Sequence, residues 1–330
     1  MKIEYKGKTI NTSIYSESSE EERLTAKTEF FSKPDKSVVI AQMRKIASGG
    51  VMNDKITRYY FRDLMCKTQC ATAKWTVEDV FESPELFSLF KGKVERSPKT
   101  FDPSCSLAYN IGRAISLGGK AYAQIPTNFP VKVADEVIEK YGKNDTVYDF
   151  SCGWGARLTS ALKHNKNYFG TDPNYLLIER LNNLTNDWKS NISNNSKVVL
   201  KDCGSEIFIP EWVNSVGLAF SSPPYFDLEN YNIGEQSIKL YPNYNDWLLN
   251  YFEPTIENIR QYLIPEGILA LNIKDLKNHN LTTDTSAIIY KKGFELIDII
   301  PLKNIKRVKS IGGLVNSTDE SVYIYQKLDF

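Results

Sequence analysis

The sequence predicts an α/β protein, with a mainly parallel sheet in its C-terminal part and a mainly helical N-terminal part. After the segment Pro126-Thr127-Asn128-Phe129-Pro130, short apolar strands alternate with amphipathic helices, a pattern typical of parallel sheets. Before that segment, apolar residues recur mostly at helical spacing. We therefore place a domain boundary between residues 125 and 126, which divides the chain into 1–125 and 126–330.

The N-terminal part begins with a hairpin pattern and continues as helices. Ile3, Tyr5 and Ile10 alternate about a Lys6-Gly7-Lys8 turn, which predicts two short strands. The expected elements are a hairpin over 2–15, a helix starting at Ser18 or Ser19, a helix with Val39, Met43 and Ile46 on one face before Gly49-Gly50, and helices near 53–67, 76–91 and 105–117.

The C-terminal part contains seven candidate strands. They are expected at 146–150, 168–171, 198–200, 216–220, 268–273, 294–300 and 321–327, with helices at 131–141, 156–164, 176–188 and 247–263. The last two strands follow each other without an intervening helix, so we expect them to pair antiparallel. This order predicts a Rossmann-like, seven-stranded mixed sheet that is parallel with an antiparallel edge strand.

Composition places the chain among ordinary globular proteins. Its 330 residues are 42% hydrophobic and 25% charged. Apolar runs stay far below the roughly 20 residues of a membrane helix, and the first residues have no signal core. We expect a soluble, intracellular, cytoplasmic protein without a membrane partner. Five scattered cysteines and two histidines indicate reduced thiols and no metal site.

Charge is distributed unevenly along a chain whose net charge is only +1. Residues 1–125 carry 20 Lys and Arg against 15 Asp and Glu, whereas residues 126–330 carry 21 against 25. The stretch from Arg23 to Arg62 contains nine basic and three acidic residues. This stretch fits a surface that faces phosphates, and equally a solvated face of ordinary helices.

A glycine turn follows the first strand of the predicted sheet. Asp149 ends that strand, and Gly153-Trp154-Gly155 turns the chain into the next helix. Such a turn brings backbone N–H groups and a helix N-terminus close to a ligand. The dinucleotide fingerprint has a third glycine where this chain has Leu158, so a nicotinamide cofactor is the weaker interpretation.

Acidic residues also end the next two strands. Asp172 follows the second strand, where a carboxylate can accept both hydroxyls of a ribose, and Asp202 follows the third, where it can accept from an adenine amino group. One such residue is most simply a loop cap. Three acids at adjacent strand ends, including Asp149, fit an adenosine-containing ligand.

The tetrapeptide Ser222-Pro223-Pro224-Tyr225 follows the apolar strand at 216–220. A Pro-Pro pair is often only a rigid turn. At the carboxyl edge of a parallel sheet, however, the Ser222 hydroxyl and the Pro223 carbonyl can accept the two hydrogens of an amine. Tyr225 offers a face on which a base can stack.

In their order and content, these motifs resemble those of S-adenosylmethionine-dependent DNA amino-methyltransferases. The resemblance covers residues 126–330 and implies a methyltransferase domain of the predicted fold. It implies that the methionine part lies near Asp149, Phe150, Ser151, Cys152, Gly153 and Gly155, under Thr127, Asn128 and Phe129. It implies that adenosine lies near Asp172, Pro173, Asp202 and Cys203, and that Ser222 contacts both cofactor and base. Ser151 departs from the family, which commonly has glycine there.

The resemblance implies site-specific methylation of DNA, with S-adenosylhomocysteine as the product and no metal. Duplex DNA would be bound with a flipped target base, as in restriction-modification enzymes of bacteria and phages. Serine at the first position of the tetrapeptide favours N4 of cytosine slightly over N6 of adenine. Alternatives are an RNA or protein amide N-methyltransferase, a catalytically silent nucleic-acid-binding protein and, third, a nicotinamide-dependent enzyme.

Target recognition has few places in this chain. About twenty residues separate Asp202 from Ser222, too few for a recognition domain, so residues 1–125 are the candidate. Further candidate site residues lie after the tetrapeptide. They are Tyr231, Gln236 and Tyr241 in a long loop, Asn272 and Asp275 after the next strand, and Lys303, Lys306, Arg307 and Lys309 before Gly312-Gly313, a basic loop suited to a phosphate backbone or simply solvated.

Overall fold

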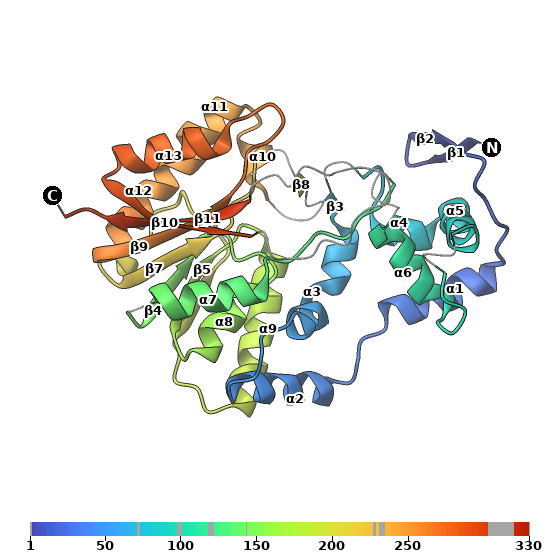
Figure 1. Cartoon of the computed structure of the whole chain (residues 1–330), viewed down its shortest axis with the longest axis horizontal. Coiled ribbons are helices and arrows are strands. Elements are labelled where there is room, and N and C mark those ends of the chain that lie inside the picture. Colours follow the sequence, from blue (N-terminus) through green and yellow to red (C-terminus); the bar gives the residue numbers. More distant parts are fainter. Residues whose placement is uncertain are drawn as a thin grey trace.

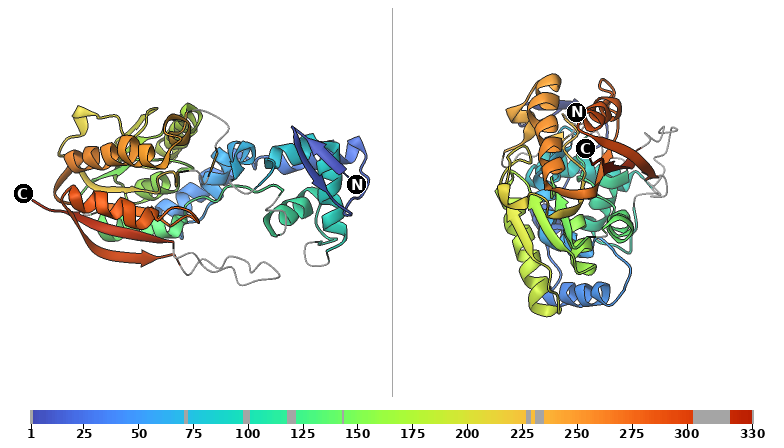
Figure 2. Two further views of the ribbon diagram at one scale, coloured as in Figure 1. Left: turned by 90° about the horizontal axis from the view of Figure 1, so that it is seen from above. Right: turned by 90° about the vertical axis from the view of Figure 1, so that its left-hand side faces the viewer.

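The computed structural model describes residues 2–70, 73–97, 101–117, 122–142, 144–226, 229–230, 235–302 and 320–329. It has two lobes that lie side by side along the long axis of the molecule (Figures 1 and 2). We call residues 126–302 and 320–329 the sheet lobe. Residues 2–31 and 73–117 are the helical lobe, and the helix at 55–67 lies between the two lobes.

The sheet lobe is built on one seven-stranded sheet in the described residues, in the order β10-β11-β9-β7-β4-β5-β6. The strands are β4 (Thr146–Asp149), β5 (Asn167–Thr171), β6 (Val198–Lys201), β7 (Val216–Ser221), β9 (Leu263–Ile273), β10 (Phe294–Pro301) and β11 (Ser321–Lys327). Neighbours among β4, β5, β6, β7 and β9 are parallel, and β11 is antiparallel to both β9 and β10. The predicted mixed sheet is confirmed, with the antiparallel strand second from the edge.

Helices cover both faces of this sheet (Figure 1). One face carries α7 (Val131–Tyr141), α8 (Ala156–Lys163) and α9 (Tyr175–Asn191), and the other carries α12 (Glu253–Tyr262) and α13 (Leu281–Lys291). Two large apolar cores, one on each side, hold these layers together. Strand order reverses between β4 and β7, which is where open α/β sheets bind ligands.

The helical lobe contains the hairpin β1 (Lys2–Tyr5) and β2 (Lys8–Asn11), with α1 (Glu20–Phe31), α4 (Val77–Glu82), α5 (Pro84–Glu95) and α6 (Leu107–Leu117). The hairpin turning at Lys6-Gly7 is as predicted. The start of α1 is also as predicted, because Ser19 caps α1 in a capping box with Glu22. The helix expected at 76–91 is wrong as a single element. Ser83 leaves the helical conformation before Pro84 and caps the second helix, α5.

Helices α2 (Lys36–Ala47) and α3 (Lys55–Lys67) pack on the sheet lobe although they precede residue 126. Val39, Met43, Ile46 and Phe61 belong to the same apolar core as α7, α8 and α9. The boundary at 125/126 stays a prediction. The packing shows that a helix N-terminal to this boundary reaches the sheet lobe, and that α3 reaches the glycine turn, where Phe61 contacts the ring of Trp154.

Several elements between and after the strands differ from the prediction. The helix expected at 247–263 begins as a π-helix, Trp247–Phe252, just before Pro254, which cannot donate the backward hydrogen bond of an α-helix. Helices α10 (Ser237–Leu240), α11 (Tyr244–Asp246) and α13, and a 3-10 turn at Pro210–Trp212, were not predicted.

A short strand pair, β3 (Gln69–Cys70) with β8 (Glu229–Asn230), was also not predicted. It connects the end of α3 to the loop that follows the tetrapeptide. In the described part of the chain, no helix combines the length and apolar character needed to cross a membrane.

Candidate active site

A cavity of about 2410 Å³ lies at the carboxyl edge of the sheet and extends toward the helical lobe. Its lining includes the loop after β4, the loop after β7 and the first turn of α3. Small-molecule pockets usually measure roughly 300–1,000 Å³. The cavity is therefore large enough for a cofactor and part of a second, larger ligand.

The glycine turn after β4 has the conformation that its glycines permit. Gly153 and Gly155 have φ values of 51° and 75°, in the left-handed region. A Cβ on Gly155 would lie 3.1 Å from Leu181 and 3.2 Å from Phe61, so this residue also allows α3 and α9 to approach the turn. Gly153 lines the cavity, whereas Gly155 stands outside the described residues that line it.

Asp149 forms a buried ion pair beneath the cavity. Its Oδ2 atom accepts from Arg157 Nε at 2.8 Å and from the Tyr168 hydroxyl at 2.7 Å, and its Oδ1 accepts from Ser221 Oγ at 2.8 Å. Arg157 also donates to the Ser151 carbonyl at 2.6 Å. Asp149 is fully buried and outside the described cavity lining, so it fixes the glycine turn and the end of β7 relative to each other.

The other two strand-end acids line the cavity. Asp172 accepts from the backbone N–H groups of Gly153 (3.1 Å) and Asn174 (3.0 Å). Burial raises the pKa of its carboxyl to about 6. Asp202 is exposed to the cavity, beside a half-buried Cys203 thiol whose pKa is raised by burial.

The segment before α7 closes the cavity beside the glycine turn. The Asn128 amide donates to Thr57 Oγ1 of α3 at 3.0 Å, and Phe129 lies edge-on to Phe220. The lining also includes the predicted residues Thr127, Phe150, Ser151, Cys152 and Pro173. Burial raises the pKa of the Cys152 thiol well above its usual value, so this cysteine is a neutral packing group.

The tetrapeptide follows β7, the strand that pairs with β4, and all four of its residues line the cavity. Ser222 Oγ donates to the Tyr225 hydroxyl at 3.1 Å. The Asn272 Nδ2 atom lies 3.0 Å from Ser222 Oγ, 2.6 Å from the Tyr225 hydroxyl and 3.2 Å from Glu320 Oε1. Asn272, which the sequence indicated, and Glu320, which it did not, therefore orient Ser222 and Tyr225.

The remaining predicted residues separate into three groups. Gln236 and Tyr241 line the cavity. Asp275 instead accepts from the backbone N–H of Thr282 near the start of α13 and lies outside the described lining. Tyr231, Lys303, Lys306, Arg307, Lys309 and Gly312-Gly313 lie outside the described residues.

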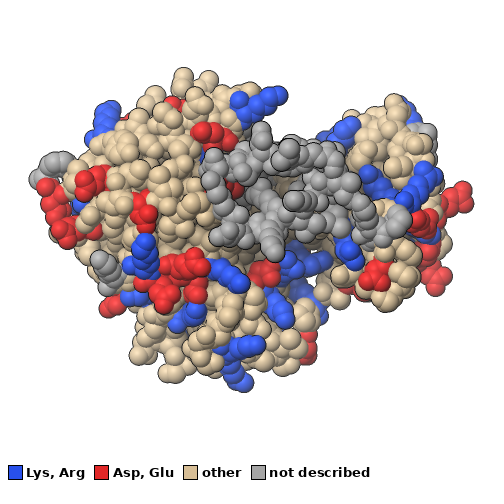
Figure 3. Space-filling model, viewed as in Figure 1, with Lys and Arg blue, Asp and Glu red and all other residues tan. Residues whose placement is uncertain are grey.

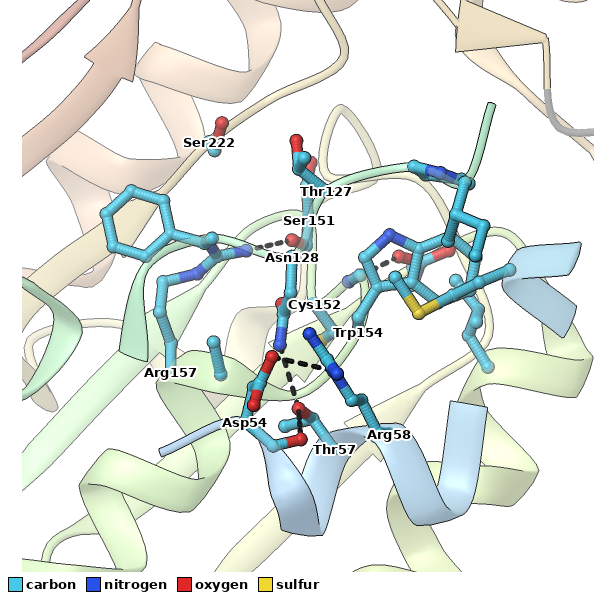
Figure 4. A pocket seen from close by; sticks show the side chains of 18 of the residues that line it. Asp54, Thr57, Arg58, Thr127, Asn128, Ser151, Cys152, Trp154, Arg157 and Ser222 are labelled. Carbon is cyan, nitrogen blue, oxygen red and sulfur yellow. Dashed lines mark hydrogen bonds and ion pairs between the residues drawn. The ribbon is translucent and has the colours of Figure 1, made fainter. Parts of the chain in front are cut away.

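Sequence reasoning missed functional candidates on α3. Figure 4 shows Asp54, Thr57 and Arg58 pointing toward the turn that carries Cys152 and Trp154. The only available signal was the opposite charge of Asp54 and Arg58 at a spacing of four, which occurs on many solvated helices. Glu206 and Glu320 were missed because single acids outside strand ends carry no pattern.

The cavity has two chemically different walls. The wall formed by the loops at the carboxyl edge of the sheet, which we call the acidic wall, carries Asp172, Asp202, Glu206, Glu235 and Glu320. Its two basic residues are paired, Arg157 with Asp149 and Lys274 with Glu320. Among the described residues, the buried atoms Glu206 Oε2 and Asn272 Oδ1 have no hydrogen-bond partner. This wall therefore offers acceptors to a cationic or hydroxyl-bearing ligand.

The opposite wall, which we call the basic wall, comes from the end of α1, from α3 and α6, and from the start of α7. It carries Lys33, Lys55, Arg58, Arg62, Arg113 and Lys132 against Glu29, Asp54 and Asp63. Figure 3 shows Lys and Arg side chains gathered near the junction of the lobes. The exposed ring of Tyr109 lies beside the Arg113 guanidinium, 5.9 Å from ring centre to charge.

No group of three or more His, Cys, Asp or Glu side chains is placed to hold a metal ion in the parts of the chain that the structure describes.

No family model matches the chain, and no curated protein matches it. Solved structures with a similar fold include a TehB-like SAM-dependent methyltransferase from Corynebacterium glutamicum, with 15% identity over 59% of this chain and 86% of that chain and a TM-score of 0.39. The N-methyltransferase NodS from Bradyrhizobium japonicum has 10% identity over 60% and 94%, with a TM-score of 0.41.

A third neighbour is a Burkholderia thailandensis 1,6-didemethyltoxoflavin-N1-methyltransferase, solved with S-adenosylhomocysteine. Its identity is 12% over 60% of this chain and 78% of that chain, with a TM-score of 0.41. The fold assignment rests on the strand order of this chain.

Proposed function

We propose that the protein is an S-adenosylmethionine-dependent DNA methyltransferase that modifies an exocyclic amine of a flipped-out base, N4 of cytosine in preference to N6 of adenine. One observation carries the proposal. Ser222-Pro223-Pro224-Tyr225 leaves β7 where the strand order reverses and shares one cavity with the glycine turn, Asp172 and Asp202.

The acidic wall fits this cofactor. A sulfonium and an ammonium group need nearby negative charge, and ribose hydroxyls and an adenine amino group need acceptors. Asp172, Asp202 and Glu206, whose Oε2 atom has no hydrogen-bond partner in the part of the chain that the structure describes, supply both. When bound, S-adenosylmethionine would supply a methyl group already activated for transfer, so the chain has only to position and polarise the acceptor.

The tetrapeptide would prepare the acceptor amine. Because Ser222 Oγ gives its own hydrogen to Tyr225, an oxygen lone pair remains to accept an amine hydrogen, and the Pro223 carbonyl can accept the other. Asn272 Oδ1, buried and without a partner among the described residues, is a third acceptor beside them. These acceptors favour the pyramidal nitrogen that attacks the methyl group.

The basic wall supports DNA as the partner. A duplex whose base enters the cavity must lay its phosphates across the mouth, where Lys55, Arg113 and Lys132 lie. Tyr109, about half exposed beside Arg113, adds a stacking surface for nucleotides. An uncharged small substrate would require neither feature.

The test is incubation with S-adenosylmethionine and either unmethylated genomic DNA or total RNA, followed by digestion to nucleosides and mass spectrometry. We expect N4-methylcytosine or N6-methyladenine from DNA with the wild-type protein and neither with Ser222→Ala. Methylated nucleosides from RNA alone, or none despite demonstrated cofactor binding, would overturn the DNA assignment in favour of an RNA or protein substrate.

A further inference from the structure

Helix α3 lies outside the sheet-lobe motifs, yet its first turn sits against both segments expected to surround methionine. Thr57 Oγ1 accepts from the Asn128 amide at 3.0 Å. Phe61, one turn further, contacts the ring of Trp154 and packs against Gly155. Residues four apart on a helix share a face. The start of α3 therefore covers the gap between the Pro126–Pro130 segment and the glycine turn.

An ion pair lies at this place. Arg58 Nε is 2.7 Å from Asp54 Oδ2, and both residues line the cavity. Asp54 occupies the N-cap position of α3, but its side chain makes no capping hydrogen bond to the helix. The contact engages Nε of Arg58, and the outer edge of the guanidinium carries further donors in a planar fork.

We infer that Asp54 and Arg58 bind the amino-acid end of S-adenosylmethionine, Arg58 taking the carboxylate and Asp54 the ammonium group. This inference rests on the proposed function, because it concerns the same cofactor. A zwitterion presents one anion and one cation a few ångströms apart, and a side-by-side acid and base offer the complementary arrangement. The N-terminus of α3 adds a partial positive charge that also favours the carboxylate.

The exposure of the pair supports a ligand-binding role over a structural one. The Arg58 and Asp54 side chains keep 62% and 42% of their surface exposed. Exposed helical ion pairs contribute little to stability. The pair can therefore open toward a ligand without loosening α3, which is held by buried Ile56, Thr57, Tyr60 and Phe61.

Two ligands that differ only in the amino-acid end test the inference. S-adenosylhomocysteine carries that end, whereas 5′-methylthioadenosine keeps the adenosine and the thioether and lacks it. Their affinities are measured by calorimetry for the wild-type protein, for Arg58→Ala and for Lys45→Ala, a control that removes an exposed cation of α2 outside the described cavity lining. We expect Arg58→Ala to weaken S-adenosylhomocysteine about tenfold or more and to leave methylthioadenosine unchanged. We expect Lys45→Ala to change neither.

The outcomes separate this inference from the proposed function. Equal effects of Arg58→Ala on both ligands, or none on either, with normal binding to the wild-type protein, would overturn the role of Arg58 and leave the proposed cofactor intact. If the wild-type protein binds neither ligand, both proposals are overturned. The thermal unfolding midpoint of Arg58→Ala, expected to be unchanged, shows whether a loss of affinity comes from the missing side chain.

Discussion

The acidic and basic walls of the cavity are built by different parts of the fold. Asp172 and Asp202 come from strand ends, which parallel pairing brings together at one edge of the sheet. The basic wall collects Lys55, Arg58 and Arg113 from helices whose order along the chain does not place them together. A motif along the sequence can therefore predict the first wall, and only the packed structure reveals the second.

The largest expected effect is on folding stability, at the buried ion pair between Asp149 and Arg157. Replacing Arg157 with methionine leaves the fully buried Asp149 without its cation, and breaking such a pair costs about 3–5 kcal/mol of unfolding free energy. Urea unfolding followed by intrinsic fluorescence measures the loss. Arg58→Met, which breaks an exposed pair on the basic wall, should cost less than about 1 kcal/mol. Equal losses would refute the contrast between a structural and a ligand-facing pair.

The next effect concerns chemistry on the acidic wall. Ser222→Ala removes an acceptor for the amine, and losing one such polarising group lowers kcat by roughly 10²–10³-fold. Cofactor affinity and DNA affinity should stay within about twofold, because Ser222 acts on the reacting nitrogen. Single-turnover transfer of labelled methyl groups, with binding measured in parallel, checks this. Undiminished transfer would remove Ser222 from the reaction.

A smaller effect is expected on the basic wall. The double substitution Arg113→Glu with Lys132→Glu should weaken DNA binding roughly ten- to thirtyfold for all sequences alike. The fall of log affinity with log salt should become shallower, its slope decreasing in magnitude by about 1.8. Cofactor affinity should not change. Lys45→Glu with Lys189→Glu changes the charge equally on exposed residues outside the described cavity lining, and unchanged binding is expected there. Equal weakening by both pairs would indicate a net-charge effect.

The smallest expected effect is a pH dependence of cofactor affinity, caused by Asp172 on the acidic wall. Asp172, with its pKa raised to about 6, must be ionised to accept ribose hydroxyls, so affinity for S-adenosylhomocysteine should fall about tenfold from pH 7 to pH 5. The folding stability of the ligand-free protein depends on pH in the opposite direction. A carboxyl whose pKa is raised by folding stabilises the protein at low pH and loses that contribution as pH rises through about 6. Calorimetry across this range checks the first sign, and Asp172→Asn should show weak, pH-independent binding.

Much of the fold was predictable because local patterns and tertiary structure agree. Val131–Tyr141 was predicted with its bounds, and the seven strands were predicted within a few residues, since buried parallel strands are continuous apolar runs bounded by turns. The acidic wall of the cavity followed from these strand ends. Its position could be predicted because Asp149, Asp172 and Asp202 end neighbouring strands.

The remainder depended on packing that no local pattern records. Helix α13 begins Leu281-Thr282-Thr283-Asp284-Thr285, a weak helix former that is stabilised by burial of Leu281, Thr285 and Ile289. Asp149 was expected near the methionine part of a cofactor, and the pairing of its carboxylate with Arg157 beneath the glycine turn was not predicted. Asp54, Arg58 and Glu320 reach the cavity through contacts between segments far apart in the sequence.

Helix α3 has a consequence for how the two proposed ligands affect each other's affinity. One end touches the segment around Asn128, and the other continues into β3, which pairs with Glu229–Asn230 in the loop after the tetrapeptide. Its 13 residues span about 20 Å as a single rod. A rod fixed at both ends couples them, and coupling free energies are reciprocal. Whatever factor a bound cofactor adds to affinity for DNA, DNA must add to affinity for the cofactor, and the two titrations measure one number.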